Sequence, residues 1–178
     1  MNSQLVKVTT ALTLLVFAAT ANAQRSAGEH IDDVTLATSV KARLVDDDVV
    51  RASEINVETN AGNVALIGYV DTEEQKKRAI SLAGKTDGAE HVIDAMVVQP
   101  GGRSLGQTVD DEALHAKVKL EIAGVGGKEA VDVVVEVRRG EVLLGGFVRD
   151  QDAKNEIGRK VKAVEDVSEV HNRLGIRK

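Results

Sequence analysis

The strongest constraint in this sequence is an internal repeat. Residues 32–98 align with residues 110–176 at a constant offset of 78 positions and without a gap. A repeat of this kind marks one structural unit present twice, and a chain of 178 residues has room for two small domains. Because units of roughly 67 residues bury only about 60% of their unfolded surface, we expect the two copies to support each other.

Each copy opens with a pattern typical of a helix. Leu36, Val40 and Leu44 recur every four residues, which places them on one face of a helix. The matching residues of the second copy are Leu114, Val118 and Ile122. Aspartates precede both patterns, and we expect their carboxylates to cap the two helices. These aspartates are Asp32, Asp33, Asp110 and Asp111.

Two strands joined by a tight turn follow in each copy. Residues 55–59 alternate between apolar and polar side chains, as a half-buried strand does, and residues 64–70 are almost continuously apolar, as in a central strand. Gly62 lies in the turn between them, where positive φ is required. The second copy has the same features at residues 133–137, Gly140 and residues 142–148.

A second helix and a last strand complete each copy. Thr72 and Asp150 occupy matching positions as helix caps. The last strands are predicted at residues 92–98 and 170–176. The fold class is therefore α+β: two domains, each with the order helix, strand, strand, helix, strand, and a three-stranded sheet packed against two helices.

The N-terminus has the three parts of a secretory signal peptide. Lys7 supplies the positive charge, residues 8–21 form a short apolar centre, and Ala21-Asn22-Ala23 resembles a cleavage site. A buried or membrane-spanning helix is the alternative, but the apolar run is shorter than the roughly 20 residues that span a bilayer. We therefore expect a signal peptide at residues 1–23, a periplasmic product and no transmembrane segment in the mature chain.

The motifs of the two copies resemble those of the BON domain family. In the first copy they read Leu36-x3-Val40-Lys41-x2-Leu44, Ile55-x-Val57, Gly62, Val64-x-Leu66-x-Gly68-x-Val70 and Val92-x-Asp94-x-Met96-x-Val98. In the second they read Leu114-x3-Val118-Lys119-x2-Ile122, Val133-x-Val135, Gly140, Val142-x-Leu144-x-Gly146-x-Val148 and Val170-x-Asn172-x-Leu174-x-Ile176. Two such copies behind a signal peptide resemble the osmotically inducible periplasmic proteins.

This resemblance implies a domain layout and a function. BON domains are expected at residues 32–98 and 110–177, with a linker at residues 99–109 that contains the only proline. The family's members are noncatalytic modules associated with envelope phospholipid and osmotic stress, sometimes with chaperone-like behaviour. The resemblance thus predicts binding to phospholipid and support of envelope integrity.

Composition argues against several other classes of function. The net charge of −5 disfavours a general nucleic-acid binder, and the absence of cysteine removes disulfides, thiolate metal sites and a lipidated cysteine. The four histidines are scattered and form no metal-binding motif: His30, His91, His115 and His171. We find no nucleophile elbow or phosphate loop, and we predict no enzyme, no metal and no cofactor.

Charge differs between the two copies. Residues 32–98 hold 7 basic and 13 acidic side chains, whereas residues 110–178 hold 13 and 14. If basic groups of the second copy share a face, that face can meet anionic phospholipid headgroups. The candidate lipid-binding residues are Lys117, Lys119, Lys154, Arg159, Lys160 and Lys162. The alternative is an ordinary solvated helix face balanced by Asp152, Glu156 and Glu165.

Two aromatic residues outside the N-terminal segment occupy matching positions. Tyr69 and Phe147 alternate with core residues of the predicted central strands, so they point to the sheet face away from the helices. They are candidates for a contact surface, either between the domains or with a partner. A chaperone-like or scaffold protein that binds envelope polypeptides through such faces and strand edges is the alternative function.

Overall fold

The first domain contains two helices and a three-stranded sheet. The structure, a computed structural model, describes residues 32–102, 104–125 and 132–177. The predicted signal peptide at residues 1–23 lies outside these ranges. The elements of the first domain are a first helix over residues 32–45, the 3-10 helix η1 (Ala52–Glu54), β1 (Ile55–Asn60), β2 (Asn63–Val70), α2 (Glu73–Gly84) and β3 (His91–Val98).

The second domain repeats this order. Its elements are α3 (Leu105–Ala123), β4 (Val133–Arg138), β5 (Glu141–Val148), α4 (Gln151–Lys162), β6 (Glu169–Asn172) and β7 (Gly175–Ile176). The last strand, which we predicted as one segment over residues 170–176, is thus divided in two. The N–H of Arg173 donates to the carbonyl of Leu144 (2.9 Å), so the chain stays beside β5 across the interruption.

The middle strand of each sheet is its most buried strand. β2 pairs with β1 in antiparallel and with β3 in parallel orientation, and β5 pairs in the same way with β4 and β6. All eight residues of β2 are buried, as are seven of the eight in β5. The continuous apolar runs therefore correspond to central strands covered on both faces, as predicted.

The helices of each domain cover one face of its sheet. In the first domain, Leu36, Val40 and Leu44 pack with Leu66 of β2 and Ala79 of α2. The equivalent core of the second domain contains the predicted helix residues Leu114, Val118 and Ile122. The two-helix layer expected from the sequence is therefore present twice.

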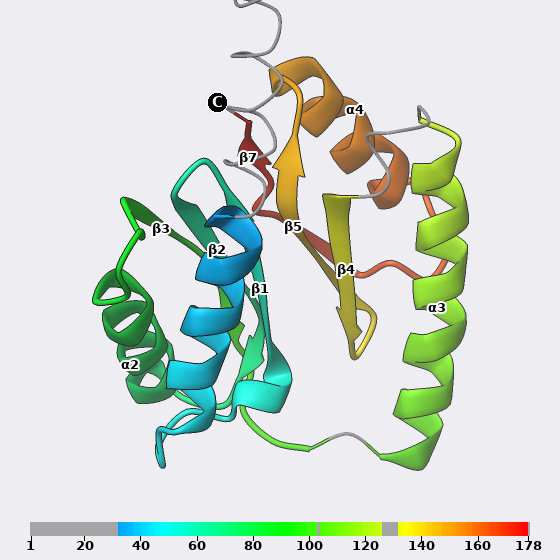
Figure 1. Ribbon diagram of the computed structural model, residues 1–178. Coiled ribbons are helices and arrows are strands. Elements are labelled where there is room, and N and C mark those ends of the chain that lie inside the picture. The colour runs from blue at the N-terminus through cyan, green and yellow to red at the C-terminus, as the bar shows by residue number, and fades with distance from the viewer. Residues whose placement is uncertain (1–31, 103, 126–131, 178) are drawn as a thin grey trace, which may run out of the picture.

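The opposite faces of the two sheets pack against each other. Figure 1 shows the helices on the outside and the strands in the middle of the molecule. Tyr69 and Phe147 are only 5% and 4% exposed, and they lie in one apolar cluster between the sheets together with Ile67 and Leu143. The structure thus places both aromatic rings in the contact between the domains.

The aspartates that we predicted as caps of the opening helices have another role. α3 begins at Leu105, within the span expected to be linker, and its N-terminus is closed by a capping box of Ser104 and Gln107. Asp111 lies in the second turn of α3, and its carboxylate accepts from the backbone N–H groups of Arg139 (2.9 Å) and Gly140 (3.0 Å). The cap prediction was therefore wrong for α3.

The same contact occurs in the first domain. The carboxylate of Asp33 accepts from the N–H groups of Ala61 (3.0 Å) and Gly62 (3.4 Å). Both turns place two successive residues at positive φ, which directs their N–H groups to one side of the hairpin. Each aspartate therefore joins its helix to a hairpin turn. The other two predicted caps are confirmed, because the side chains of Thr72 and Asp150 accept from the N–H groups three residues later.

Candidate functional site

The six candidate lipid-binding residues lie on two neighbouring helices. Lys117 and Lys119 belong to α3, and the other four belong to α4. The two helices contact each other, and Lys160 Nζ on α4 lies 3.4 Å from Glu121 Oε1 on α3. The fold therefore brings these residues to one side of the second domain.

Three of the six basic groups already have partners. Lys154 Nζ donates to the carbonyl oxygen of Leu174 (2.6 Å), and this half-buried lysine is held at the sheet edge. Lys117 Nζ lies 2.8 Å from Asp166 Oδ2, and this contact raises the pKa of Lys117. Exposed ion pairs such as Lys117–Asp166 and Lys160–Glu121 contribute little to stability and exchange readily with solvent. Of these three, Lys154 is the one with a structural role, because it binds a backbone carbonyl of the second domain.

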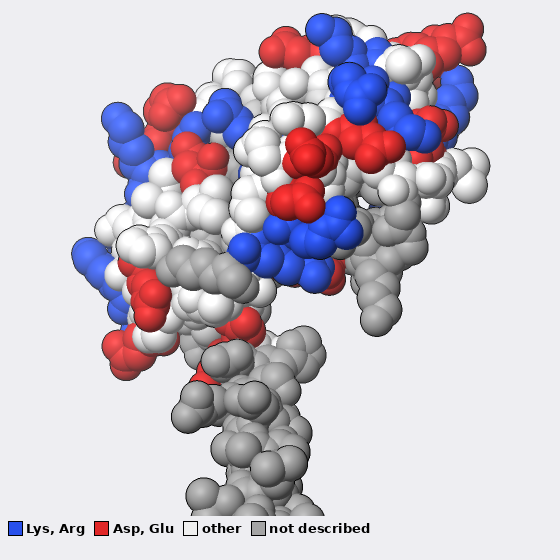
Figure 2. Space-filling view, turned by 90° about the horizontal axis from the view of Figure 1, so that it is seen from above, with Lys and Arg blue, Asp and Glu red and all other residues white. Residues whose placement is uncertain are grey.

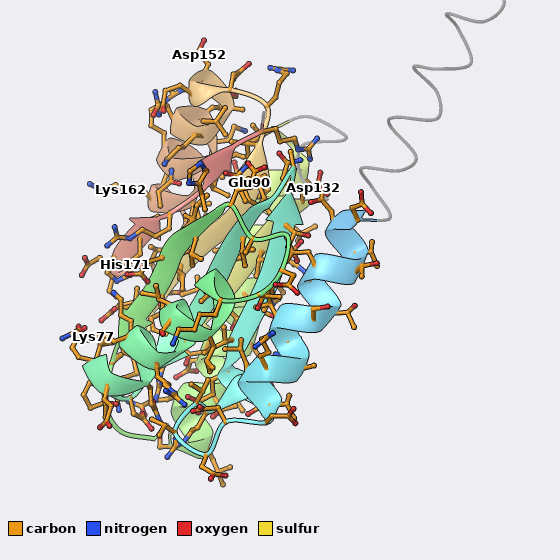
Figure 3. The ribbon with its side chains drawn as sticks, turned by 60° about the vertical axis from the view of Figure 1, so that its left-hand side comes forward. Lys77, Glu90, Asp132, Asp152, Lys162 and His171 are labelled. Atoms are coloured by element: carbon orange, nitrogen blue, oxygen red, sulfur yellow. The ribbon has the colours of Figure 1, made fainter. Side chains whose placement is uncertain are left out.

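The other three basic side chains are exposed. Within the described residues Lys119, Arg159 and Lys162 have no ion pair, and Figure 3 shows Lys162 at the end of α4 on the outside of the molecule. Arg159, Lys160 and Lys162 occupy the last turn of α4, where positive charge interacts favourably with the helix dipole. Figure 2, which looks onto the end of the molecule nearest α4, shows basic groups interspersed with acidic ones. The surface is mixed in charge, with free cations among ion pairs.

An apolar stripe on α3 was missed from the sequence. Leu105, Val109 and Leu120 are 89%, 66% and 76% exposed, although all three are large and apolar. Exposed alanines continue the stripe: Ala113, Ala116 and Ala123. The spacing i, i+4, i+8, i+11, i+15, i+18 was available in the sequence, but it began in residues that we assigned to the linker. We call these six residues the α3 stripe.

The α3 stripe lies opposite the core face of the same helix. At about 100° per residue, its members cluster within roughly a quarter of the circumference, and Leu114, Val118 and Ile122 point to the other side. Lys119 and Lys117 flank the stripe on its two sides, and the exposed Glu112 lies between the stripe and Lys119. The helix therefore has one apolar face that packs in the domain core and a second apolar face that is exposed to solvent.

A separate polar group lies where β5 meets β6. His171 Nε2 is 3.1 Å from Glu141 Oε2, and His171 Nδ1 is 3.7 Å from Glu169 Oε1. These three side chains have the ligand types of a metal site. However, the two carboxylates face different ring nitrogens, and only Glu141 is within hydrogen-bond distance of the ring. The group is therefore one hydrogen-bonded pair with Glu169 beside it. The sequence did not suggest it because the pairing of β5 with β6 creates the proximity.

No helix in the described part of the chain is long and apolar enough to cross a membrane. The exposed apolar residues of α3 lie on a helix whose other face packs in the core of the second domain.

Comparisons with known proteins agree with the repeated architecture. The family model of the BON domain matches residues 32–100 and again residues 110–178. The chain is 30% identical over 148 residues to "Osmotically-inducible protein Y" of Escherichia coli strain K12, covering 83% of this chain and 74% of that one. It is 33% identical over 162 residues to "Outer membrane lipoprotein DolP" of Haemophilus influenzae, covering 89% and 83%.

A third relative has a different description. The chain is 30% identical over 152 residues to the "21 kDa hemolysin" of Actinobacillus pleuropneumoniae, covering 83% of this chain and 77% of that one. These matches indicate no catalytic family. Because the BON model matches twice and accounts for most of the sequence, this chain belongs to the BON domain family as a protein with two BON domains in tandem.

Proposed function

We propose that this protein binds anionic phospholipid reversibly at the surface of the bacterial envelope, in the periplasm, and supports the envelope under osmotic stress. The α3 stripe carries the proposal, because Leu105, Val109 and Leu120 expose apolar surface without a partner among the described residues. Two relatives support the setting, since their names describe an osmotically inducible protein and an outer membrane lipoprotein.

The α3 stripe and its basic neighbours suit a peripheral contact with a membrane. Burying a large apolar side chain contributes about 1.5–3 kcal/mol, so the three large residues can hold the helix at the headgroup boundary. Lys119 beside the stripe, with Arg159 and Lys162 on α4, can approach lipid phosphates. Because those charges are exposed, salt should weaken their contribution. The resulting contact is weak and reversible.

Polypeptide binding, the alternative function, loses its main support. The sheet faces on which we based it are covered by each other. At the edge of the first sheet, the N–H of Met96 donates to Asp94 Oδ1 (3.0 Å) and its carbonyl accepts from Lys76 Nζ (3.2 Å). The matching edge of the second sheet is occupied in the same way by Asn172 and Lys154 at Leu174. Side chains thus hinder strand addition at β3 and at the matching last strand of the second sheet.

Vesicle co-sedimentation tests the proposed function. We expect the mature chain to bind vesicles containing anionic phospholipid, to bind zwitterionic vesicles less, and to release the anionic ones as salt rises. The triple variant Leu105→Ser, Val109→Ser, Leu120→Ser should lose at least about tenfold in affinity, because the apolar contribution disappears.

The matched control uses exposed apolar residues of the first domain. Val34 and Val45 are 57% and 63% exposed on the first helix, so Val34→Ser with Val45→Ser removes exposed apolar side chains elsewhere. This control should bind as the unchanged protein does. If the α3 triple variant also binds with unchanged affinity, the proposed lipid surface is wrong.

A further inference from the structure

The contact between the two domains has approximate twofold symmetry. Tyr69 of the first domain lines a hollow with Glu136 and Arg138 at β4, and its hydroxyl donates to the carbonyl oxygen of Glu141 (3.0 Å). Phe147 of the second domain lines the matching hollow at β1. That hollow contains Glu58 and Asn60, which are the repeat equivalents of Glu136 and Arg138. Each ring therefore lies over the same strand of the opposite domain.

Equivalent positions of the repeat meet at the centre of this contact, and they differ in size. A Cβ atom on Gly145 would lie 2.4, 2.6 and 2.8 Å from the side-chain carbons of Ile67, its equivalent in the first domain. Gly145 has no positive φ, so its backbone does not require glycine. The glycine is needed for space: the isoleucine of one domain fills the volume that a side chain on the other would occupy.

Charge at the rim differs between the domains in a complementary way. Arg138 of the second domain lies 3.5 Å from Asp71 of the first, and both side chains are largely covered. The repeat equivalent of Asp71 is Arg149. Two second domains paired in this geometry would therefore place Arg138 against Arg149, which have like charges.

We propose that Ile67 and Gly145, helped by Asp71 and Arg138, make the contact between sheet faces selective for unlike domains. The face of the first domain accepts the second domain, from the same chain or from a second copy. Two first domains would oppose isoleucine to isoleucine, and two second domains would oppose glycine to glycine and arginine to arginine. A steric clash therefore disfavours pairing of two first domains. A void and the repulsion between arginines disfavour pairing of two second domains.

The single tyrosine reports directly on this contact. Tyr69 is the only tyrosine, and the sequence contains no tryptophan. Burial raises the pKa of its hydroxyl well above the usual value, and the charge of Glu141 raises it further. Since the folded state holds the proton more tightly, this contribution to docking is present below about pH 10 and is lost as pH rises through the raised pKa. Tyrosinate absorbance therefore distinguishes docked from separated domains.

The experiment compares the full chain with three variants at the central pair. We expect Gly145→Ile, which opposes two isoleucines, to lower the tyrosine titration midpoint by at least about one pH unit and to make Tyr69 accessible to a neutral quencher. Ile67→Gly, which opposes two glycines, should weaken docking less because it leaves a void. The exchanged variant Ile67→Gly with Gly145→Ile should restore the raised midpoint and the protection from quencher.

The exchanged variant decides the outcome, including the case in which Gly145→Ile lowers the content of secondary structure. Recovery on exchange supports selective pairing, and failure of the exchange to restore docking overturns it. A tyrosine that stays protected in Gly145→Ile also overturns it. Gly106→Ile is the matched control, because a Cβ there would meet only Ser104 Oγ, at 4.0 Å. It should titrate as the unchanged protein does.

Discussion

Replacing Gly146 by alanine is expected to lower the free energy of unfolding by about 3 kcal/mol or more. Its φ of +95° lies in the region that disfavours side chains, and an added Cβ would lie 2.1 Å from the backbone oxygen of Asp132. The equivalent Gly68 has the same conflict, since its Cβ would lie 1.9 Å from the oxygen of Glu54. Backbone strain and overpacking therefore act together, and denaturant unfolding followed by circular dichroism measures the loss.

Gly84 provides the control for this prediction. It ends α2 without positive φ, and an added Cβ would make an ordinary contact with Val92 at 3.7 Å. Gly84→Ala should leave stability unchanged or raise it by about 0.4–1 kcal/mol, because alanine lowers the entropy of the unfolded chain. Equal stability of Gly146→Ala and Gly84→Ala would show that the crowding at Gly146 is absent.

Replacing Asp111 by alanine has the second large expected effect. Asp111 is 3% exposed, and its two oxygens accept from the N–H groups of Arg139 and Gly140. Removing the carboxylate leaves these donors unpaired beside the core, so we expect a loss of about 3 kcal/mol in the free energy of unfolding. Asp111→Asn should lose less, because one amide oxygen still accepts.

Two other aspartates calibrate the Asp111 result in the same unfolding assay. Asp33→Ala should cost less than Asp111→Ala, since Asp33 is only half-buried and one of its contacts is longer, at 3.4 Å. Asp110 is exposed beside Asp111, and Asp110→Ala should change stability little. If Asp110→Ala and Asp111→Ala cost the same, the helix-to-hairpin contact does not stabilise the domain.

Local patterns explain why so much of the fold was predictable. The four-residue spacing of Leu114, Val118 and Ile122 predicts a helix from a short stretch of sequence. The continuous apolar runs likewise predict the buried strands β2 and β5. The repeat then showed that the same domain occurs twice. The start of α3 also has a local signal, the capping box of Ser104 and Gln107. The nearby proline and glycines nevertheless led us to assign these residues to a linker.

Contacts between distant residues explain what was not predictable. The carboxylate of Asp111 binds the N–H of Arg139, 28 residues later in the chain. From the sequence alone, a carboxylate near the start of a helix is interpreted as a cap, because the position of the hairpin is not known. Lys154 looks like a free surface charge until the last strand brings the carbonyl of Leu174 to it. The α3 stripe was missed for a different reason: its first residues, Leu105 and Val109, lie in the segment that we assigned to the linker, so the second apolar face of the helix was not recognised.

The central claim is that α3 is the part of this tandem-BON protein that meets the membrane. Because the sequence has no cysteine, Ala116→Cys places a single polarity-sensitive fluorophore within the α3 stripe, and Ser81→Cys places one on the exposed side of α2 as control. On addition of anionic vesicles, we expect the emission at position 116 to shift to shorter wavelength and the emission at position 81 to stay constant. An unchanged emission wavelength at position 116, or an equal shift at both positions, would contradict the account.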